Sequence, residues 1–83
     1  MYSLDISPRA KQQLKKFPKR YKAAINEAIK TIQEEPLFGK PLTRELTGRF
    51  SYKVGVYRII YIINEKDKVV QVITAGHRGT IYD

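Results

Sequence analysis

Few residues of this sequence could do acid–base or phosphate chemistry, and most of them are cations. The chain has no cysteine and a single histidine, His77. The lack of cysteine excludes a thiolate nucleophile, disulfides and cysteine-bound zinc, and one histidine cannot form a cluster, so we expect no metal site. Sixteen Lys or Arg residues against eight Asp or Glu residues give a net charge of +8. This balance favours a polyanionic partner such as nucleic acid, an anionic membrane or an acidic protein.

Arg58 is the most informative of these cations. It interrupts an otherwise apolar stretch, Val56 to Ile63, where alternation puts it on the same face as Ile60 and Ile62. Burying a charge without a partner is expensive, so an arginine here needs a counter-charge or a ligand. One interpretation is an internal ion pair with Glu45 or another carboxylate. The other is an anion-binding residue on the open face of a sheet.

The N-terminal half is predicted to be one strand followed by two helices. Residues 2–6 alternate between apolar and polar and predict a short strand. Ser7 as N-cap and Pro8 at the first helical position predict a helix start, and Pro18 interrupts this first helix. Apolar residues at helical spacing from Tyr21 to Ile32 predict a second, amphipathic helix.

The C-terminal half is predicted to be a meander of three strands. Residues 50–54, 56–64 and 68–75 are rich in Val, Ile and Tyr, with Gly55 and residues 64–67 as hairpin turns. The order is therefore β-α-α-β-β-β. It predicts an α+β fold in which two N-terminal helices pack on a small, mainly antiparallel four-stranded sheet.

The length predicts a single domain over residues 1–83. The N-terminal residues lack the basic start and apolar run of a signal peptide, and the longest apolar run, 59–63, is far shorter than the roughly 20 residues that span a bilayer. We therefore expect a cytoplasmic protein without a membrane partner.

Two segments of the C-terminal half resemble the RelE/ParE superfamily of bacterial and archaeal toxins, and the RelE branch more closely. They are SYKVGVYRIIYIIN (51–64) and VVQVITAGHRGTIY (69–82), and their more specific parts are YRIIY and GHRGTIY. The predicted order of elements is also similar to that of the family, which implies a RelE-like fold. Members of the RelE branch are messenger-RNA endonucleases, many of which act in the ribosome, and an antitoxin encoded beside each one neutralises it.

The resemblance implies a reaction without metal or cofactor, in which the RNA 2′-hydroxyl attacks the adjacent phosphate. Arg58 and Arg78 resemble phosphate-binding arginines of the family, and Lys53 resembles a catalytic lysine. Tyr82 resembles the C-terminal tyrosine that orients or deprotonates the attacking group or stacks on a base. His77 is suited to an acid or a base role, because a histidine side chain can give or take a proton near neutral pH. The predicted catalytic set is thus Lys53, Arg58, His77, Arg78 and Tyr82.

These residues also have plainer interpretations. Lys53, Arg78 and His77 could be ordinary solvated side chains, and Tyr82 could belong to a fraying chain end. Tyr57 and Tyr61 are interpreted as core residues.

The other basic residues are predicted to dock RNA through its phosphates. One group forms a solvated helix face suited to ribosomal RNA, and the other belongs to the loop and strand that frame the site. The predicted RNA-binding residues are Lys15, Lys16, Lys19, Arg20 and Lys22, with Arg44 and Arg49.

The leading prediction is a toxin that cleaves mRNA on the ribosome without a metal, and whose partners are mRNA, the ribosome and an acidic, RelB-like antitoxin. One alternative is a ParE-like inhibitor of DNA gyrase, a toxin without an active site, although the basic and tyrosine residues favour RNA cleavage. The other is a non-catalytic RNA-binding domain. The sequence lacks the glycine-rich and paired aromatic signatures of the common RNA modules, which argues against this last alternative.

Overall fold

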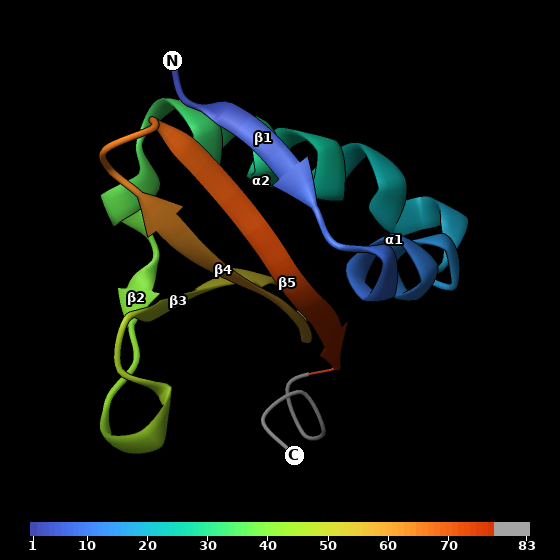
Figure 1. Cartoon of the computed structure of the whole chain (residues 1–83). Coiled ribbons are helices and arrows are strands. Elements are labelled where there is room, and N and C mark those ends of the chain that lie inside the picture. The colour runs from blue at the N-terminus through green and yellow to red at the C-terminus, as the bar shows by residue number, and fades with distance from the viewer. Residues whose placement is uncertain (78–83) are drawn as a thin grey trace.

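The computed structural model describes residues 1–77 and shows two helices covering one face of a five-stranded sheet (Figure 1). The strand order is β1-β5-β4-β3-β2, in which β1 pairs parallel with β5 and all other neighbours are antiparallel. The strands are β1 (Ser3–Ile6), β2 (Lys40–Pro41), β3 (Arg49–Val54), β4 (Tyr57–Asn64) and β5 (Val69–His77). The helices are α1 (Pro8–Lys15) and α2 (Lys22–Glu34), with short 3-10 turns η1 (Lys19–Tyr21), η2 (Pro36–Phe38) and η3 (Arg44–Leu46).

The predicted α+β class is confirmed, and the predicted number of four strands is wrong. The additional strand is β2, in which Lys40 pairs with Ser51 and Pro41 pairs with Phe50. Two residues are too few to show a period of two, and a proline ordinarily indicates a loop. The sequence of this edge strand therefore shows no pattern by which a strand could be predicted.

α1 begins as predicted, and its cap also fastens it to the sheet. The Ser7 hydroxyl oxygen accepts a hydrogen bond from Ala10 N at 3.0 Å, while the same hydroxyl donates to Ile73 O at 3.0 Å. Pro8 occupies the first helical position, where no backbone N–H is needed. Because the Ser7 amide also donates to Val72 O at 2.9 Å, the start of α1 is held against β5 through both the backbone and the side chain of Ser7.

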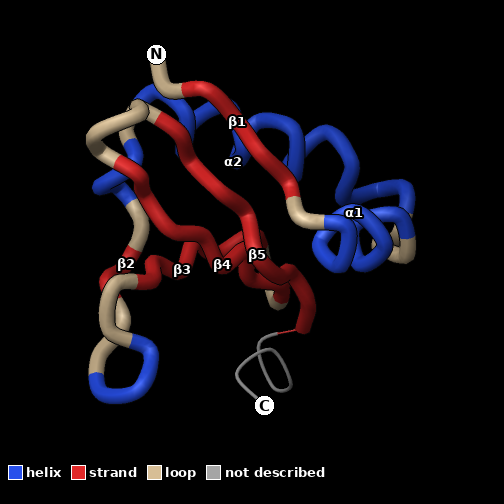
Figure 2. Tube along the Cα trace, in the orientation of Figure 1, coloured by secondary structure: helices blue, strands red, loops and turns tan. Residues whose placement is uncertain are grey.

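The core lies between the helices and one face of the sheet. Neither α1 nor α2 covers the opposite face (Figure 2), which we call the open face, although Ser51 and Ile60 on it are buried. Helix α2 contributes its buried Ile25, Ala28 and Ile32. Strands β4 and β5 contribute Ile59, Tyr61, Val70, Val72 and Ala75, and Ala10, Phe17 and Val54 complete the core. Since successive side chains of a strand point to opposite faces, the intervening residues of β3 and β4 lie on the open face.

Tyr61 ties the segment that follows α2 onto the sheet. Its fully buried hydroxyl donates to Pro36 O at 2.6 Å and accepts from Gly39 N at 3.0 Å, and its ring stacks on Phe50 with centroids 5.6 Å apart. Burial raises the pKa of Tyr61, because removal from water disfavours the phenolate; the Gly39 hydrogen bond acts in the opposite direction. A side chain at Gly39 would overlap the Tyr61 hydroxyl, so the packing at this residue requires glycine.

Candidate active site

The register of the β3–β4 hairpin brings two of the predicted catalytic cations together. Lys53 of β3 is the direct cross-strand partner of Arg58 of β4, and both lie on the open face. Gly55, with φ of +61°, forms the turn between them, a conformation that glycine adopts without strain. Lys53 is exposed and Arg58 is half-buried, so the pair presents its charge at the sheet surface.

Lys53 and Arg58 line a cleft of about 400 Å³, whose other wall comes from the segment held by Tyr61. That wall consists of Phe38, Gly39 and Lys40, and Ser51 and Tyr52 complete the lining. A neighbouring hollow of about 350 Å³ shares Lys40 and Arg58 with the cleft. The other residues that line this hollow are Pro41, Leu42, Thr43 and Leu46.

The cleft is cationic. Lys40, Lys53 and Arg58 line it, and its described lining includes no carboxylate. Glu45, the suggested ion-pair partner of Arg58, is exposed on η3. A guanidinium can hold two oxygens of a phosphate at once, and partial burial strengthens that attraction by lowering the local dielectric. The arrangement therefore suits a bound anion.

The structure does not bring His77 into this cleft. His77 ends β5 opposite Tyr57, and the two rings meet edge to face with centroids 6.0 Å apart. Tyr57 also packs against Phe17, so His77 lies beside the aromatic end of the core rather than beside Lys53. The predicted residues Arg78 and Tyr82 lie outside the described residues, and their roles stay predictions.

Arg44 and Arg49 lie near the smaller hollow. Arg49 is exposed at the start of β3 and pairs in register with Ile62, on the same face of the sheet as Lys53. Arg44 begins η3, the turn whose Leu46 lines the hollow. These two cations extend the positive surface of the open face beyond the cleft.

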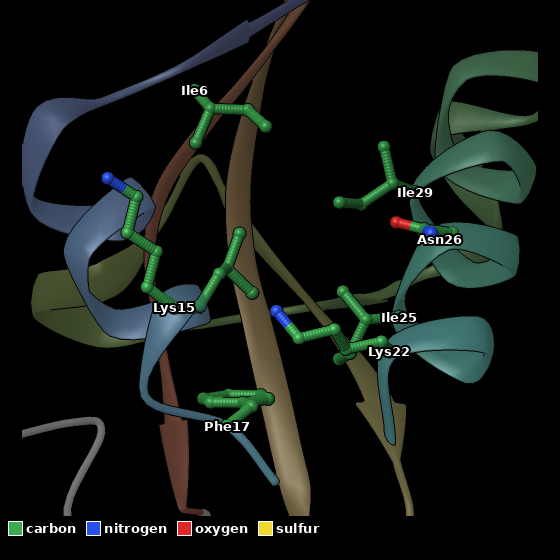
Figure 3. A pocket seen from close by; sticks show the side chains of 8 residues that line it. Ile6, Lys15, Phe17, Lys22, Ile25, Asn26 and Ile29 are labelled. Atoms are coloured by element: carbon green, nitrogen blue, oxygen red, sulfur yellow. The ribbon is translucent and has the colours of Figure 1, made fainter. Parts of the chain in front are cut away.

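The other predicted RNA-binding cations lie on the helix layer, across the sheet from the cleft. Lys15, Lys16, Lys19, Arg20 and Lys22 are all exposed. Lys15 and Lys22 border an apolar groove of about 330 Å³ between the two helices, shown in Figure 3. The groove is further lined by Ile6, Leu14, Phe17, Ile25, Asn26 and Ile29. The positive charge of the chain is therefore divided between a cleft and a separate helical surface.

Sequence reasoning predicted neither Phe38 nor Lys40 as a site residue. Both belong to the short segment between α2 and β3, and they reach the cleft because Tyr61 holds that segment against the sheet. The clustered prolines and glycine indicate a loop there. Nothing in the local pattern indicates that a tyrosine more than twenty positions later determines where the loop lies.

Within the described part of the chain, no three His, Asp or Glu side chains come together as a metal site requires. None of the helices described is long and apolar enough to cross a membrane. The fold and the cleft together define a small α+β protein with a cation-lined cleft on the open face of its sheet.

Comparison with known proteins assigns the chain to a family. Residues 4–82 match the family described as the ParE toxin of the type II toxin-antitoxin system parDE. The chain is 40% identical over 83 residues to the toxin RelG of Mycobacterium tuberculosis, an alignment that covers 98% of this chain and 95% of the relative. The chain belongs to this family and is a type II toxin of the RelE/ParE superfamily, which confirms the resemblance found in its sequence.

Solved structures of similar proteins have the same fold. The toxin-antitoxin complex RelBE2 of Mycobacterium tuberculosis contains a chain with 38% sequence identity and a TM-score of 0.85, covering 93% of this chain and 98% of that one. The intact RelBE complex of Escherichia coli matches with a TM-score of 0.81 at 23% identity, over 93% of this chain and 96% of that one, which shows the common fold.

Proposed function

We propose that this toxin is an endoribonuclease that cleaves messenger RNA on the ribosome, in the cytoplasm, and thereby inhibits translation. The observation that carries the proposal is the cross-strand pairing of Lys53 with Arg58 in a cleft that Lys40 also lines. Two relatives from Mycobacterium tuberculosis, named toxin RelG and toxin RelE, support placing the chain in the RelE branch of the superfamily.

The cations of the cleft suit the charge that develops during this reaction. The RNA 2′-oxygen bonds to phosphorus, the bond to the 5′-oxygen breaks, and the crowded phosphate carries added negative charge in between. Arg58 would hold two of the phosphate oxygens and Lys53 would act as a nearby point charge. A base takes the 2′-proton and an acid gives one to the leaving 5′-oxygen, and Tyr82 is our candidate for one of these two roles. The products are a cyclic 2′,3′-phosphate and a 5′-hydroxyl end.

The test is to add the purified toxin to a cell-free translation reaction and map the mRNA ends. We expect new 5′-hydroxyl ends with the natural sequence, and a loss of cleavage rate of roughly 10²- to 10³-fold for Arg58→Ala, comparable to removing one charge-stabilising group from an active site. Lys66→Ala, which removes an exposed cation from the β4–β5 turn, is the matched control and should cleave normally. Continued translation with no new ends would refute the proposal.

Two further measurements separate the alternatives. A gyrase supercoiling assay detects a ParE-like inhibitor directly, and we expect no inhibition. A non-catalytic RNA-binding domain would show salt-dependent RNA binding but no cleavage. If the protein inhibits supercoiling and leaves mRNA intact, the proposed nuclease is wrong and the target is gyrase.

We further propose that the toxin is neutralised by an acidic, RelB-like antitoxin. Solved relatives are toxin-antitoxin complexes, and the groove between α1 and α2 offers an apolar floor bordered by Lys15 and Lys22. An acidic segment that folds on binding fits both features. The double variant Lys15→Glu, Lys22→Glu should weaken antitoxin binding, whereas Lys30→Glu, on α2 but outside the groove, should not.

A further inference from the structure

Phe38 stands out among the residues that line the cleft, because it is apolar, aromatic and largely exposed. Phe38 is 70% exposed to solvent, although it lines the same cleft as Lys40, Lys53 and Arg58. An exposed apolar residue by itself carries no functional meaning. Phe38, however, lines a cleft whose other notable residues are cations suited to an anionic ligand, and this position requires an explanation.

The backbone that carries Phe38 is held in place on both sides. Tyr61 bonds to Pro36 O and to Gly39 N, which flank Phe38 closely in sequence. Phe38 N itself donates to Glu35 O at 2.9 Å, which closes the η2 turn. A rigid backbone leaves only the side-chain torsions to be fixed when a ligand binds, which lowers the entropic cost of the contact.

We propose that Phe38 is a stacking platform for one nucleobase of the RNA, the base next to the phosphate held by Lys53 and Arg58. The inference rests on the proposed function and adds to it a specificity-determining residue. Proteins that bind single-stranded RNA combine a positive groove with aromatic rings on which bases stack, since every base has an apolar face. The cleft volume of about 400 Å³ is within the range of small-molecule sites, enough for a single nucleotide.

Leu37 provides a matched control within the same turn. It is also 70% exposed and also part of η2, but it does not line the cleft. A merely apolar surface, such as one that docks a partner protein, would use both side chains. A stacking platform uses only Phe38 and depends on its aromatic ring.

The experiment measures binding of a single-stranded RNA hexamer in which every sugar is 2′-O-methylated, so that the 2′-oxygen cannot attack. A series of hexamers lacks one base at a time. For the natural sequence, we expect removal of one particular base to weaken binding by about 5- to 150-fold, the equivalent of one base–aromatic stack. Phe38→Ala should bind the intact hexamer more weakly by the same factor. Removal of that base should then not weaken the binding of Phe38→Ala any further. Phe38→Trp and Leu37→Ala should bind the intact hexamer as tightly as the natural sequence.

Three results would overturn the assignment: Phe38→Ala binding within about twofold of the natural sequence, Leu37→Ala losing as much affinity as Phe38→Ala, or no hexamer binding at all. The second result would indicate a protein-docking surface instead. Cleavage in cell-free translation keeps this inference separate from the proposed function. A base-dependent affinity without new mRNA ends would refute the nuclease and leave the stacking role supported. Cleavage by Phe38→Ala at the natural rate and base preference would refute the stacking role alone.

Discussion

At the scale of single residues, the cleft depends on a side chain that is not part of it. Tyr61 is fully buried in the core, yet its hydroxyl bonds to both ends of the turn that supplies Phe38 and Lys40. A buried hydroxyl with two short hydrogen bonds is satisfied in this one arrangement and costly in others. Tyr61 is therefore a positioning residue, and its two bonds can be tested separately from its ring.

We predict that Tyr61→Phe lowers the free energy of unfolding by about 1–3 kcal/mol. The ring and its stacking on Phe50 remain, while the buried Gly39 N–H and Pro36 carbonyl lose their partner. Urea unfolding provides the measurement. Tyr2→Phe is the control, because its hydroxyl makes only an exposed contact of 3.3 Å with Glu65, and it should change stability by less than about 0.5 kcal/mol. Equal effects of the two substitutions would contradict the prediction.

Alkaline pH should weaken the fold through the same hydroxyl. The pKa of Tyr61 is raised in the folded protein, chiefly by burial, so the folded state favours the neutral phenol. The stabilisation is fully present below the unfolded value of about 10 and is lost as pH rises through the folded pKa. Unfolding free energies measured from about pH 8 to 11.5 should therefore fall more steeply above about pH 10 in the natural sequence than in Tyr61→Phe. Parallel curves would exclude this role of Tyr61.

At the scale of elements, α1 depends on the bond network of a single serine. Ser7 caps the helix through Ala10 N and reaches across to Ile73 O of β5. This hydroxyl therefore joins local helix formation to tertiary packing.

We predict that Ser7→Ala costs about 1–2 kcal/mol of stability, because it removes an N-cap and leaves a half-buried carbonyl without its donor. Ser3→Ala, at an exposed position of the edge strand β1, should be close to neutral. Thermal unfolding of both variants is the appropriate measurement, and a Ser7→Ala variant as stable as Ser3→Ala would show that the cap is dispensable.

The elements that local chemistry defines could be predicted from the sequence, whereas those that depend on distant contacts could not. The Ser7–Pro8 start of α1 and the Gly55 turn follow from the preferences of those residues. β2 has no pattern of its own and exists because β3 offers it a partner. β5 begins at Val69 rather than at the predicted residue 68, since Lys68 adopts a φ of +57°.

The same distinction holds for the candidate site. Arg58 was predictable because a charge inside an apolar strand is conspicuous, and the hairpin register then placed Lys53 opposite it. The structure separates His77 from that pair, because His77 lies opposite Tyr57 and successive residues of a strand point to opposite faces. The sequence did not predict this, since the predicted strand ended at residue 75, whereas β5 extends to His77. Phe38 required knowledge of the Tyr61 contacts, which connect residues more than twenty positions apart.

At the scale of the whole molecule, the net charge of +8 is distributed over two faces with different expected roles. The cations of the cleft lie on the open face of the sheet, and a second group lies on the helix layer. Removing cations from the helix layer should weaken docking to RNA without abolishing the chemistry, because that layer lies across the sheet from the cleft.

We predict that Lys19→Ala, Arg20→Ala reduces the salt dependence of RNA binding. For a single strand, the slope of log K against log salt concentration should decrease by about 0.7 for every phosphate that the variant no longer neutralises. Lys11→Ala, Lys30→Ala removes the same charge from helix positions outside the predicted docking group and should leave the slope nearly unchanged. Equal slopes for the two double variants would mean that only total charge matters.

The order of strands also determines when each part of the sheet can form. β1 is made first, but its described sheet partner is β5, the last strand, and α1 packs against that same strand. The β3–β4 hairpin joins neighbouring segments and can pair early, whereas the pairing of β1 with β5 and the packing of α1 on β5 require residues 69–77. Contacts between segments so far apart in sequence carry a high loop-closure entropy, so we expect the β1–β5 edge of the sheet to form late in folding.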